Sequence, residues 1–226
     1  MKLGVIAGTR TDTQLGVRYV ETQGHEALGR PCSENPTQQL DMQLHHKKEL
    51  ADRVVALAAE MLAEGAEGIY IYCNSLSTAI DLDNVKKRIP APVATPLDVY
   101  AECAGLYKHI FVIAANCQSL AGIERVIKKQ NPGSWLSGAA LQALVYQIED
   151  LLPPEEIVSD LHMREFLRCF TAMKAEVLIL GCTHFPYIHE QIRDAVSVPI
   201  IDPGKRMLEL LARDLNPGSP AAPPTD

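Results

Sequence analysis

GIYIYCNS (68–75) and VLILGCTH (177–184) follow the same plan, an apolar run that ends at a cysteine and is followed by small polar side chains. Short apolar runs of this kind are typical of buried β-strands. The two segments therefore predict strands at 68–73 and 177–182, each with a cysteine at its carboxyl end. Further strands are expected at 3–8, 109–115 and 198–202, and 92–97 is expected to be a short strand or a loop.

Helical patterns lie between these strands. Leu50, Val54, Leu57 and Met61 recur at helical spacing in a segment that closes at Gly65. Comparable patterns predict helices at 77–88, 119–129, 138–152 and 155–175, and a last helix that runs through Arg213. Because parallel strands need crossover connections that helices supply, this alternation predicts an α/β fold with mainly parallel sheets and helices on both faces.

The two halves of the chain resemble each other in layout. The spacing between Cys73 and Cys182 is also the spacing between Ala7, at the end of one strand, and Asn116, at the end of another. Such a repeat predicts two pseudo-symmetric α/β domains, 1–96 and 97–202, with the helix at 203–214 able to pack back on the first. The alternative is a chance match of two α/β halves. The tail 215–226 is rich in Pro, Ala and Gly and is expected to be disordered.

Composition excludes several classes of protein. The chain has 226 residues with 21 Lys and Arg against 28 Asp and Glu, a net charge of −7, which argues against a nucleic-acid partner. No apolar run reaches membrane-spanning length, so neither a membrane segment nor a secretory leader is expected. The six cysteines form no C-x-x-C pair. We therefore expect a cytoplasmic protein with reduced thiols and a small-molecule partner.

Position in the fold separates the cysteines. In open α/β sheets ligands bind at the carboxyl ends of the strands, which is where Cys73 and Cys182 fall. The start of a helix behind each of them would favour the thiolate form. Cys103 and Cys169 lie in apolar patterns and are interpreted as core residues, Cys117 is expected beside the site, and Cys32 stays unassigned. Two opposed thiols suit stereoinversion at a carbon acid, in which one takes a proton from one face and the other donates to the opposite face.

At these residues a family resemblance can be stated. IYCNSLSTA and LILGCTHFP resemble the two cysteine signatures of the aspartate/glutamate racemase superfamily, and the second is close to the glutamate racemase form. The resemblance extends over roughly residues 1 to 213. It implies a cofactor-independent racemase that needs no metal, with two α/β domains and the active site between them. It assigns Cys73 and Cys182 as the catalytic acid/base pair.

The resemblance also implies roles for other residues. His184 corresponds to the histidine that assists the second cysteine, and Glu149, in LVYQIED, to a glutamate of the family's site. Residues that correspond to substrate-binding positions are Asn74, Ser75, Asn116, Ser119 and Thr183. The family is often dimeric, so a homodimer is compatible with the resemblance, although the residues themselves do not show the oligomeric state.

One segment departs from the glutamate racemase pattern. Where that pattern has Asp-Ser-Gly after the first strand, this chain has Ala7, Gly8, Thr9 and Arg10, with no acid at the corresponding place. We assign these four residues to substrate binding. Arg10 could clamp a side-chain carboxylate, and the alternative is a solvated arginine.

The favoured substrate is glutamate, followed by aspartate. A hydantoin racemase, a maleate-isomerase-like enzyme and a non-catalytic amino-acid-binding relative stay open as alternatives. For four other residues a structural interpretation is preferred: His45 and His46 as solvated helix residues, Asp202 as part of a turn, and Trp135 as a packing or loop residue.

Overall fold

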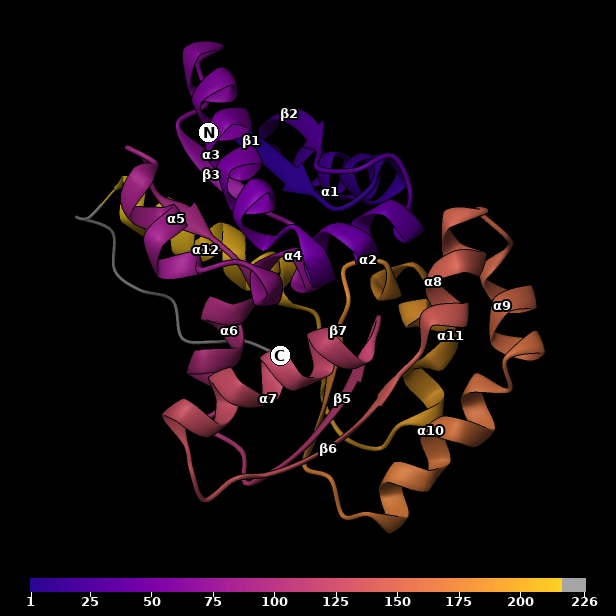
Figure 1. Ribbon diagram of the computed structural model, residues 1–226. Helices are drawn as coiled ribbons and strands as arrows, with labels where there is room; N and C mark the ends of the chain where they lie inside the picture. The colour runs from indigo at the N-terminus through magenta and orange to yellow at the C-terminus, as the bar shows by residue number, and fades with distance from the viewer. Residues whose placement is uncertain (217–226) are drawn as a thin grey trace. The chain divides into compact units, whose positions relative to one another are not determined.

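The computed structural model describes residues 1–216. The chain divides into two compact units (Figure 1). Unit 1 comprises Met1–Val99 together with the C-terminal helix α12 (Pro203–Leu215), and unit 2 comprises Tyr100–Asp202. The tail expected to be disordered lies outside the described residues from position 217 onward, whereas Leu215 ends α12. No helix in the described part of the chain is long and apolar enough to cross a membrane.

Unit 1 is built on a parallel sheet with the strand order β2-β1-β3-β4. The central strands, β1 (Lys2–Ala7) and β3 (Gly68–Ile71), are almost entirely buried, as expected for a parallel sheet covered on both faces. Beside them lie β2 (Glu26–Pro31) and the short β4 (Val93–Ala94). Ile6 pairs with Ile71, so the chain leaves β1 and β3 at adjacent points on the carboxyl edge of the sheet.

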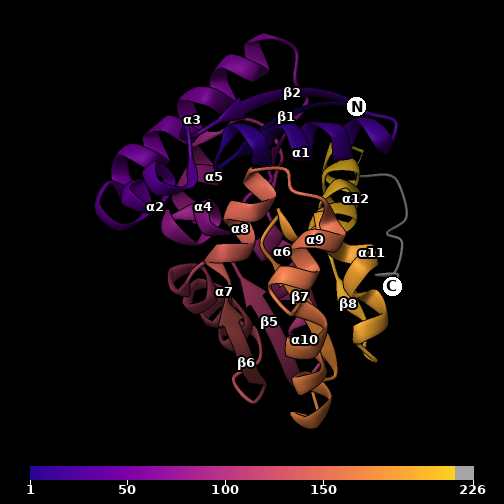
Figure 2. The same ribbon diagram turned by 90° about the vertical axis from the view of Figure 1, so that its right-hand side faces the viewer.

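The two faces of this sheet carry different helices. On the face of Val5, α1 (Arg10–Thr22) approaches closely through Gly16, where a Cβ would lie 2.7 Å from the Tyr72 ring (Figure 2). On the opposite face, at Gly4, lies Met61 of α3 (Lys47–Ala63). The remaining helices of unit 1 are α2 (Pro36–His45), α4 (Asn74–Ala79), α5 (Leu82–Arg88) and α12, and α6 (Pro96–Cys103) spans the boundary with unit 2.

Unit 2 repeats this plan with the order β6-β5-β7-β8, again all parallel. Its strands are β5 (His109–Ala114), β6 (Trp135–Ala140), β7 (Val177–Gly181) and β8 (Ile200–Ile201). Its helices are α7 (Cys117–Gln130), α8 (Gln142–Glu149), α9 (Pro154–Asp160), α10 (Met163–Ala172) and α11 (His189–Ile192), with 3-10 turns at Phe185–Ile188 and Arg193–Ala195. The predicted fold class, two similar α/β units with parallel sheets, is confirmed.

Three predicted helices differ from the structure. Segment 138–152 is not one helix, because its first residues belong to the edge strand β6 and only Gln142–Glu149 is helical. Segment 77–88 is divided at Ile80, and the Asp81 carboxylate caps the second helix by accepting from Asn84 N at 3.1 Å. Segment 155–175 is divided at Leu161 and His162, where the backbone of His162 turns left-handed with φ +48°.

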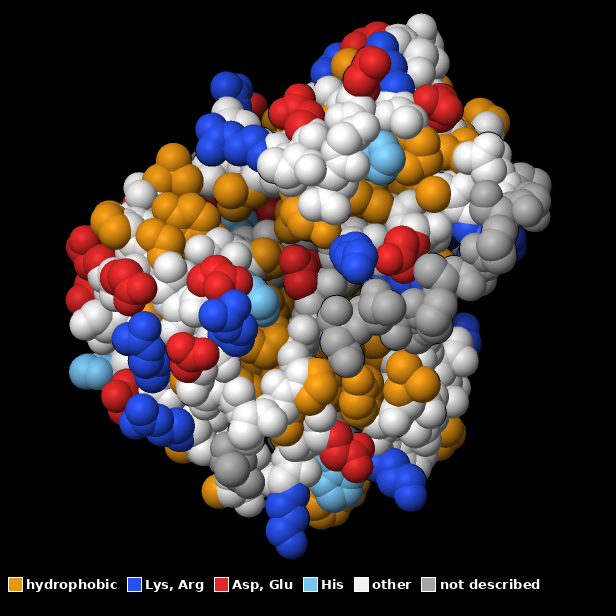
Figure 3. Space-filling model, turned by 180° about the vertical axis from the view of Figure 1, so that it is seen from behind, with side chains coloured by type: hydrophobic (Ala, Val, Ile, Leu, Met, Phe, Trp, Pro, Cys, Tyr) orange, Lys and Arg blue, Asp and Glu red, His pale blue; other side chains and the backbone are white. Residues whose placement is uncertain are grey.

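Two single residues also contradict the sequence interpretation. Cys169, expected in the core, is exposed on α10. Trp135, expected to pack or to lie in a loop, begins β6 with 71% of its surface exposed. On the face shown in Figure 3, basic and acidic side chains are interspersed.

The packing of β6 against β5 and α7 depends on Gly138. A Cβ at this position would lie 2.6 Å from the carbonyl oxygen of Val112 and 2.7 Å from Leu120 Cδ1. Gly138→Ala is therefore expected to lower the free energy of unfolding by about 1–3 kcal/mol, measured by urea denaturation. The matched control is Gly133→Ala, whose Cβ would meet nothing nearer than Asn131 Oδ1 at 3.6 Å. Equal stability of the two variants would contradict this packing.

Candidate functional site

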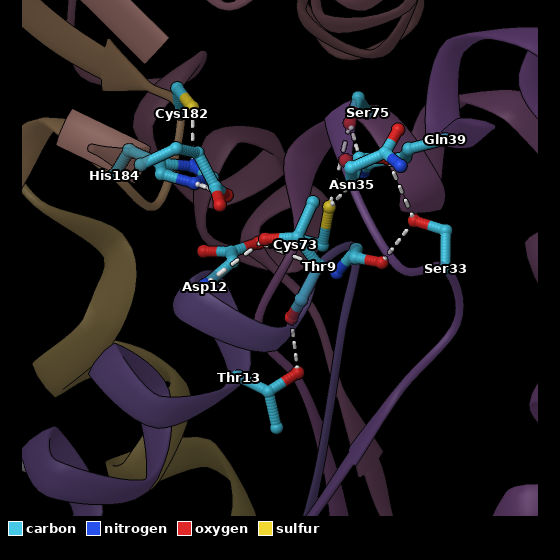
Figure 4. A network of polar contacts seen from close by, with 12 residues as sticks. Thr9, Asp12, Thr13, Ser33, Asn35, Gln39, Cys73, Ser75, Cys182 and His184 are labelled. Atoms are coloured by element: carbon cyan, nitrogen blue, oxygen red, sulfur yellow. Dashed lines mark hydrogen bonds and ion pairs between the residues drawn. The ribbon is translucent and has the colours of Figure 1, made fainter. Parts of the chain in front are cut away.

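Cys73 lies where β3 ends and α4 begins, in extended backbone with φ −163° and ψ 117°. Its side chain is buried, with 3% of the residue exposed. The sulfur contacts Gln39 Nε2 at 3.1 Å and Ser75 Oγ at 3.4 Å (Figure 4). Asn74 and Ser75, both predicted to bind substrate, are buried in the first turn of α4. Cys73 thus follows a strand as predicted, whereas the substrate-binding roles of Asn74 and Ser75 stay predictions.

Gln39 reaches the cluster from α2, a helix that the sequence interpretation did not include. Its Nε2 also donates to Ser75 Oγ at 2.9 Å. The space that it occupies exists because residue 8 is glycine: a Cβ there would lie 1.9 Å from Gln39 Nε2. Ser33 Oγ donates to the Gly8 carbonyl at 2.6 Å and fixes this loop. The signal that could have indicated the contact is the glycine itself, directly after a buried strand.

The first turn of α1, which follows β1, contains a carboxylate that the sequence interpretation did not assign to the site. Thr9 caps α1, since its Oγ1 accepts from Asp12 N at 3.1 Å, and the Thr9 carbonyl accepts from Thr13 Oγ1 at 2.6 Å. Asp12 is fully buried, and its Oδ2 accepts from Gly8 N at 3.4 Å. Because Gly8 and Cys73 follow neighbouring strands, this carboxylate lies at the same edge of the sheet as Cys73.

Arg10 does not join this cluster. Its guanidinium forms an ion pair with Glu34 at 2.6 Å, and the two side chains are 68% and 57% exposed. It lines a surface hollow of about 570 Å³ between α1 and β2, whose lining does not include Cys73. The structure therefore favours the solvated interpretation of Arg10, and its role as a carboxylate clamp stays untested.

Cys182 occupies the equivalent place in unit 2, directly after β7. It is buried, and its Sγ lies 3.5 Å from His184 Nδ1. The other ring nitrogen, His184 Nε2, lies 2.6 Å from Glu149 Oε1, and both side chains are largely buried. The three residues predicted to act together are thus contiguous: a thiol, an imidazole and a carboxylate in series. Thr183, between the thiol and the imidazole in sequence, is buried as well.

The Glu149 carboxylate determines what His184 can do. A carboxylate only accepts, so the short contact requires a proton on Nε2 of the imidazole. Nδ1 can then accept the thiol proton of Cys182 or, once protonated, donate to the thiolate. This relay can store a proton beside the sulfur, which is a property that an acid/base thiol needs.

Asn116 and Ser119 interact with each other at the start of α7. Asn116 Oδ1 accepts from Ser119 N and from Ser119 Oγ, both at 2.9 Å, which is the geometry of a helix N-cap. Their predicted part in substrate binding stays a prediction.

The other four cysteines differ in burial. Cys117 and Cys169 are exposed, and Cys103 is buried as expected. Cys32 is buried at the end of β2, and burial raises the pKa of its thiol to about 12, against a smaller opposing effect of the Arg53 charge. Within residues 1–216 no group of three or more His, Cys, Asp and Glu side chains is arranged to hold a metal ion.

Comparison with known proteins gives a consistent picture. The model of the family described as Asp/Glu/Hydantoin racemase matches residues 4–211. A glutamate racemase of Staphylococcus carnosus is 26% identical over 149 residues, which cover 62% of this chain and 54% of that protein. The matched part therefore spans about half the length of that relative.

Solved structures share the fold. A glutamate racemase from Francisella tularensis, in complex with D-glutamate, has a TM-score of 0.71 at 20% identity and covers 93% of this chain and 79% of its own. An allantoin racemase from Klebsiella pneumoniae has a TM-score of 0.69 at 16% identity and covers 98% of this chain and 90% of its own. At these identities the likeness shows a common architecture.

The raised pKa of Cys32 makes stability depend on pH. Below pH 9 the thiol keeps its proton in the folded and unfolded states alike. Above the ordinary value of 9.0 the unfolded chain loses the proton while the folded protein retains it up to about 12, so the unfolded state binds fewer protons. The free energy of unfolding should consequently fall by about 1.4 kcal/mol per pH unit in this window.

Cys32→Ala isolates this effect from other alkaline titrations. The stability difference between wild type and Cys32→Ala, measured by urea denaturation, is expected to be constant below pH 9 and to move against the wild type between pH 9 and 12. A difference that does not change with pH would show that the thiol titrates normally.

Proposed function

The chain belongs to the Asp/Glu/hydantoin racemase family, and on that premise we propose that it is a cofactor-independent racemase of an acidic amino acid, glutamate ahead of aspartate. The observation that carries the proposal is the pair of buried thiols at equivalent strand ends, each with its own polar partners. A structural cysteine needs no such partners, because an apolar pocket satisfies a thiol.

The proposed reaction is a proton exchange at Cα between Cys73 and Cys182. One sulfur, as thiolate, removes the Cα proton from one face of the substrate and becomes a thiol. The other, as thiol, delivers its proton to the opposite face and becomes a thiolate. No atom other than hydrogen is transferred, and the reverse reaction restores the starting protonation. The buried side chains of Asn74, Ser75 and Thr183 are proposed to bind the substrate's α-carboxylate and ammonium.

In this mechanism the polar partners of each sulfur stabilise the charge that forms on it. When Cys182 is left as thiolate, protonated His184 pairs with it, and the Glu149 carboxylate stabilises the imidazolium. Around Cys73, the Gln39 amide and the Ser75 hydroxyl are the contacts that stabilise a thiolate. The mechanism requires both thiols to be reduced, so we place the protein in the cytoplasm. A homodimer stays a prediction.

A hydantoin racemase is retained as the second candidate. The reason is Arg10, the residue predicted to clamp a second carboxylate, which is exposed and paired with Glu34. Because Arg10 lies on the surface and pairs with Glu34, a substrate without a side-chain carboxylate is also tested.

The assignment of the thiols can be tested with chiral substrates. L-glutamate, D-glutamate, L-aspartate and a 5-substituted hydantoin are each incubated with the protein, and loss of optical activity is followed by polarimetry. One substrate is expected to racemise, and Cys73→Ser or Cys182→Ser should slow it by about 10²-fold or more, since a serine hydroxyl is a far weaker acid/base partner. Cys169→Ser, at an exposed thiol on α10, is the control. Racemisation that survives either of the first two substitutions would reject the corresponding role.

The Glu149 charge is tested by Glu149→Gln. The amide oxygen can still accept the His184 Nε2 proton, so the contact is kept while the negative charge is removed. We expect kcat to fall about tenfold or more, with the pH–rate profile displaced, because the imidazolium loses its counter-charge. The matched control is Glu156→Gln on the exposed part of α9. An unchanged profile in Glu149→Gln would limit Glu149 to a packing role.

A further inference from the structure

The chemistry of the Gln39 amide fixes the direction of the two hydrogen bonds that it makes beside Cys73. Gln39 Nε2 is an amide nitrogen, which carries two hydrogens and accepts nothing. Its contacts with Cys73 Sγ at 3.1 Å and with Ser75 Oγ at 2.9 Å are therefore both donations. Figure 4 shows the Gln39 side chain directed at these two atoms. The sulfur thus receives at least one hydrogen from outside its own strand.

Ser75 Oγ lies 3.4 Å from the sulfur, and either atom can donate in this contact. Because the Ser75 oxygen already accepts from Gln39, its single hydroxyl hydrogen is available for the sulfur. With that hydrogen directed at the sulfur, two donors converge on Cys73. A thiolate, which has no hydrogen and three lone pairs, satisfies both of them, whereas a thiol must direct its own hydrogen elsewhere.

We propose that Gln39 is a positioning residue that holds Cys73 in its thiolate form, directly through one N–H and indirectly by turning the Ser75 hydroxyl toward the sulfur. This inference rests on the proposed function in one respect only: if the protein is a racemase, Cys73 is the base in the resting enzyme. Cys182 has different partners, since its sulfur lies beside His184 Nδ1, which can exchange a proton with the thiol.

Neighbouring residues hold the Gln39 side chain in position. Gln39 is 9% exposed and stands in the first turn of α2, whose N-cap Asn35 accepts from Gln38 N at 2.9 Å. Gly8 provides the space for its amide, as the distance of 1.9 Å from a Cβ at that position shows. Asn35 thus starts the helix that directs the amide at the sulfur.

Two titratable groups come from the elements packed beside Cys73 in unit 1. The thiol of Cys32, from the end of β2, has its pKa raised by burial to about 12 and stays neutral. The Asp12 carboxylate, from α1, accepts from Gly8 N and is the negative group of the cluster. Its charge opposes a thiolate at Cys73, so removing it should act in the opposite direction to removing Gln39.

The test is a pH titration of thiolate ultraviolet absorbance, in which the signal of Cys73 is the difference between each protein and its Cys73→Ser counterpart. Gln39→Met fills a similar volume without donating, and we expect it to move the Cys73 transition to higher pH by about one unit or more. Gln130→Met, the same change at an exposed glutamine at the end of α7, should leave it in place. Asp12→Asn should move it to lower pH.

Ser75→Ala removes the second donor and provides an independent upward shift should Gln39→Met fail to fold. A transition that stays in place in both Gln39→Met and Ser75→Ala would overturn the inference. Since the titration uses no substrate, its result is separate from the racemase proposal. A shifted transition without racemisation of any substrate would reject the function alone, and racemisation with an unshifted transition would reject the role of Gln39 alone.

Discussion

The pairing of β1 with β3 in parallel is the constraint on which the chemistry of unit 1 depends. It sets Ile6 opposite Ile71 and so brings the loop of Gly8 next to Cys73 at one edge of the sheet. From that edge α1 contributes Asp12 and α2 contributes Gln39, both buried. In an antiparallel arrangement the two chain ends would leave at opposite edges, and these side chains could not meet the thiol.

Unit 2 uses the same backbone plan with different side chains. Its sheet has the equivalent strand order, and Cys182 follows β7 as Cys73 follows β3. The partners differ in charge: an amide and a hydroxyl surround the first sulfur, and an imidazole backed by a carboxylate stands beside the second. The same backbone plan therefore carries two sulfurs with different polar partners.

Strand ends and contacts between residues close in sequence could be predicted, whereas contacts between distant elements could not. The strand ends at Cys73 and Cys182 could be read from apolar runs, and the link from Cys182 to His184 is only two residues long. Gln39 could not be found this way, because its contact with Cys73 joins residues that are 34 positions apart and arises from the packing of α2. The contact of Asp12 with Gly8 spans only four residues and lies at the start of α1, a helix that was not predicted from the sequence. The prediction that Cys169 lies in the core was wrong because α10 is amphipathic. Met163, Leu167 and Phe170 share the buried face of this helix, and Cys169 lies on the opposite, exposed face.

The central claim is that two different thiols exchange the Cα proton, and the isotopic composition of early reaction products tests it most directly. One pure enantiomer of the accepted substrate is converted in D₂O, and both enantiomers are separated at low conversion for mass spectrometry. With two bases, the product should carry deuterium at Cα while the remaining substrate stays protiated, because the donor to each face is a different group. Deuterium that enters substrate and product at the same rate would indicate a single base and would contradict the account.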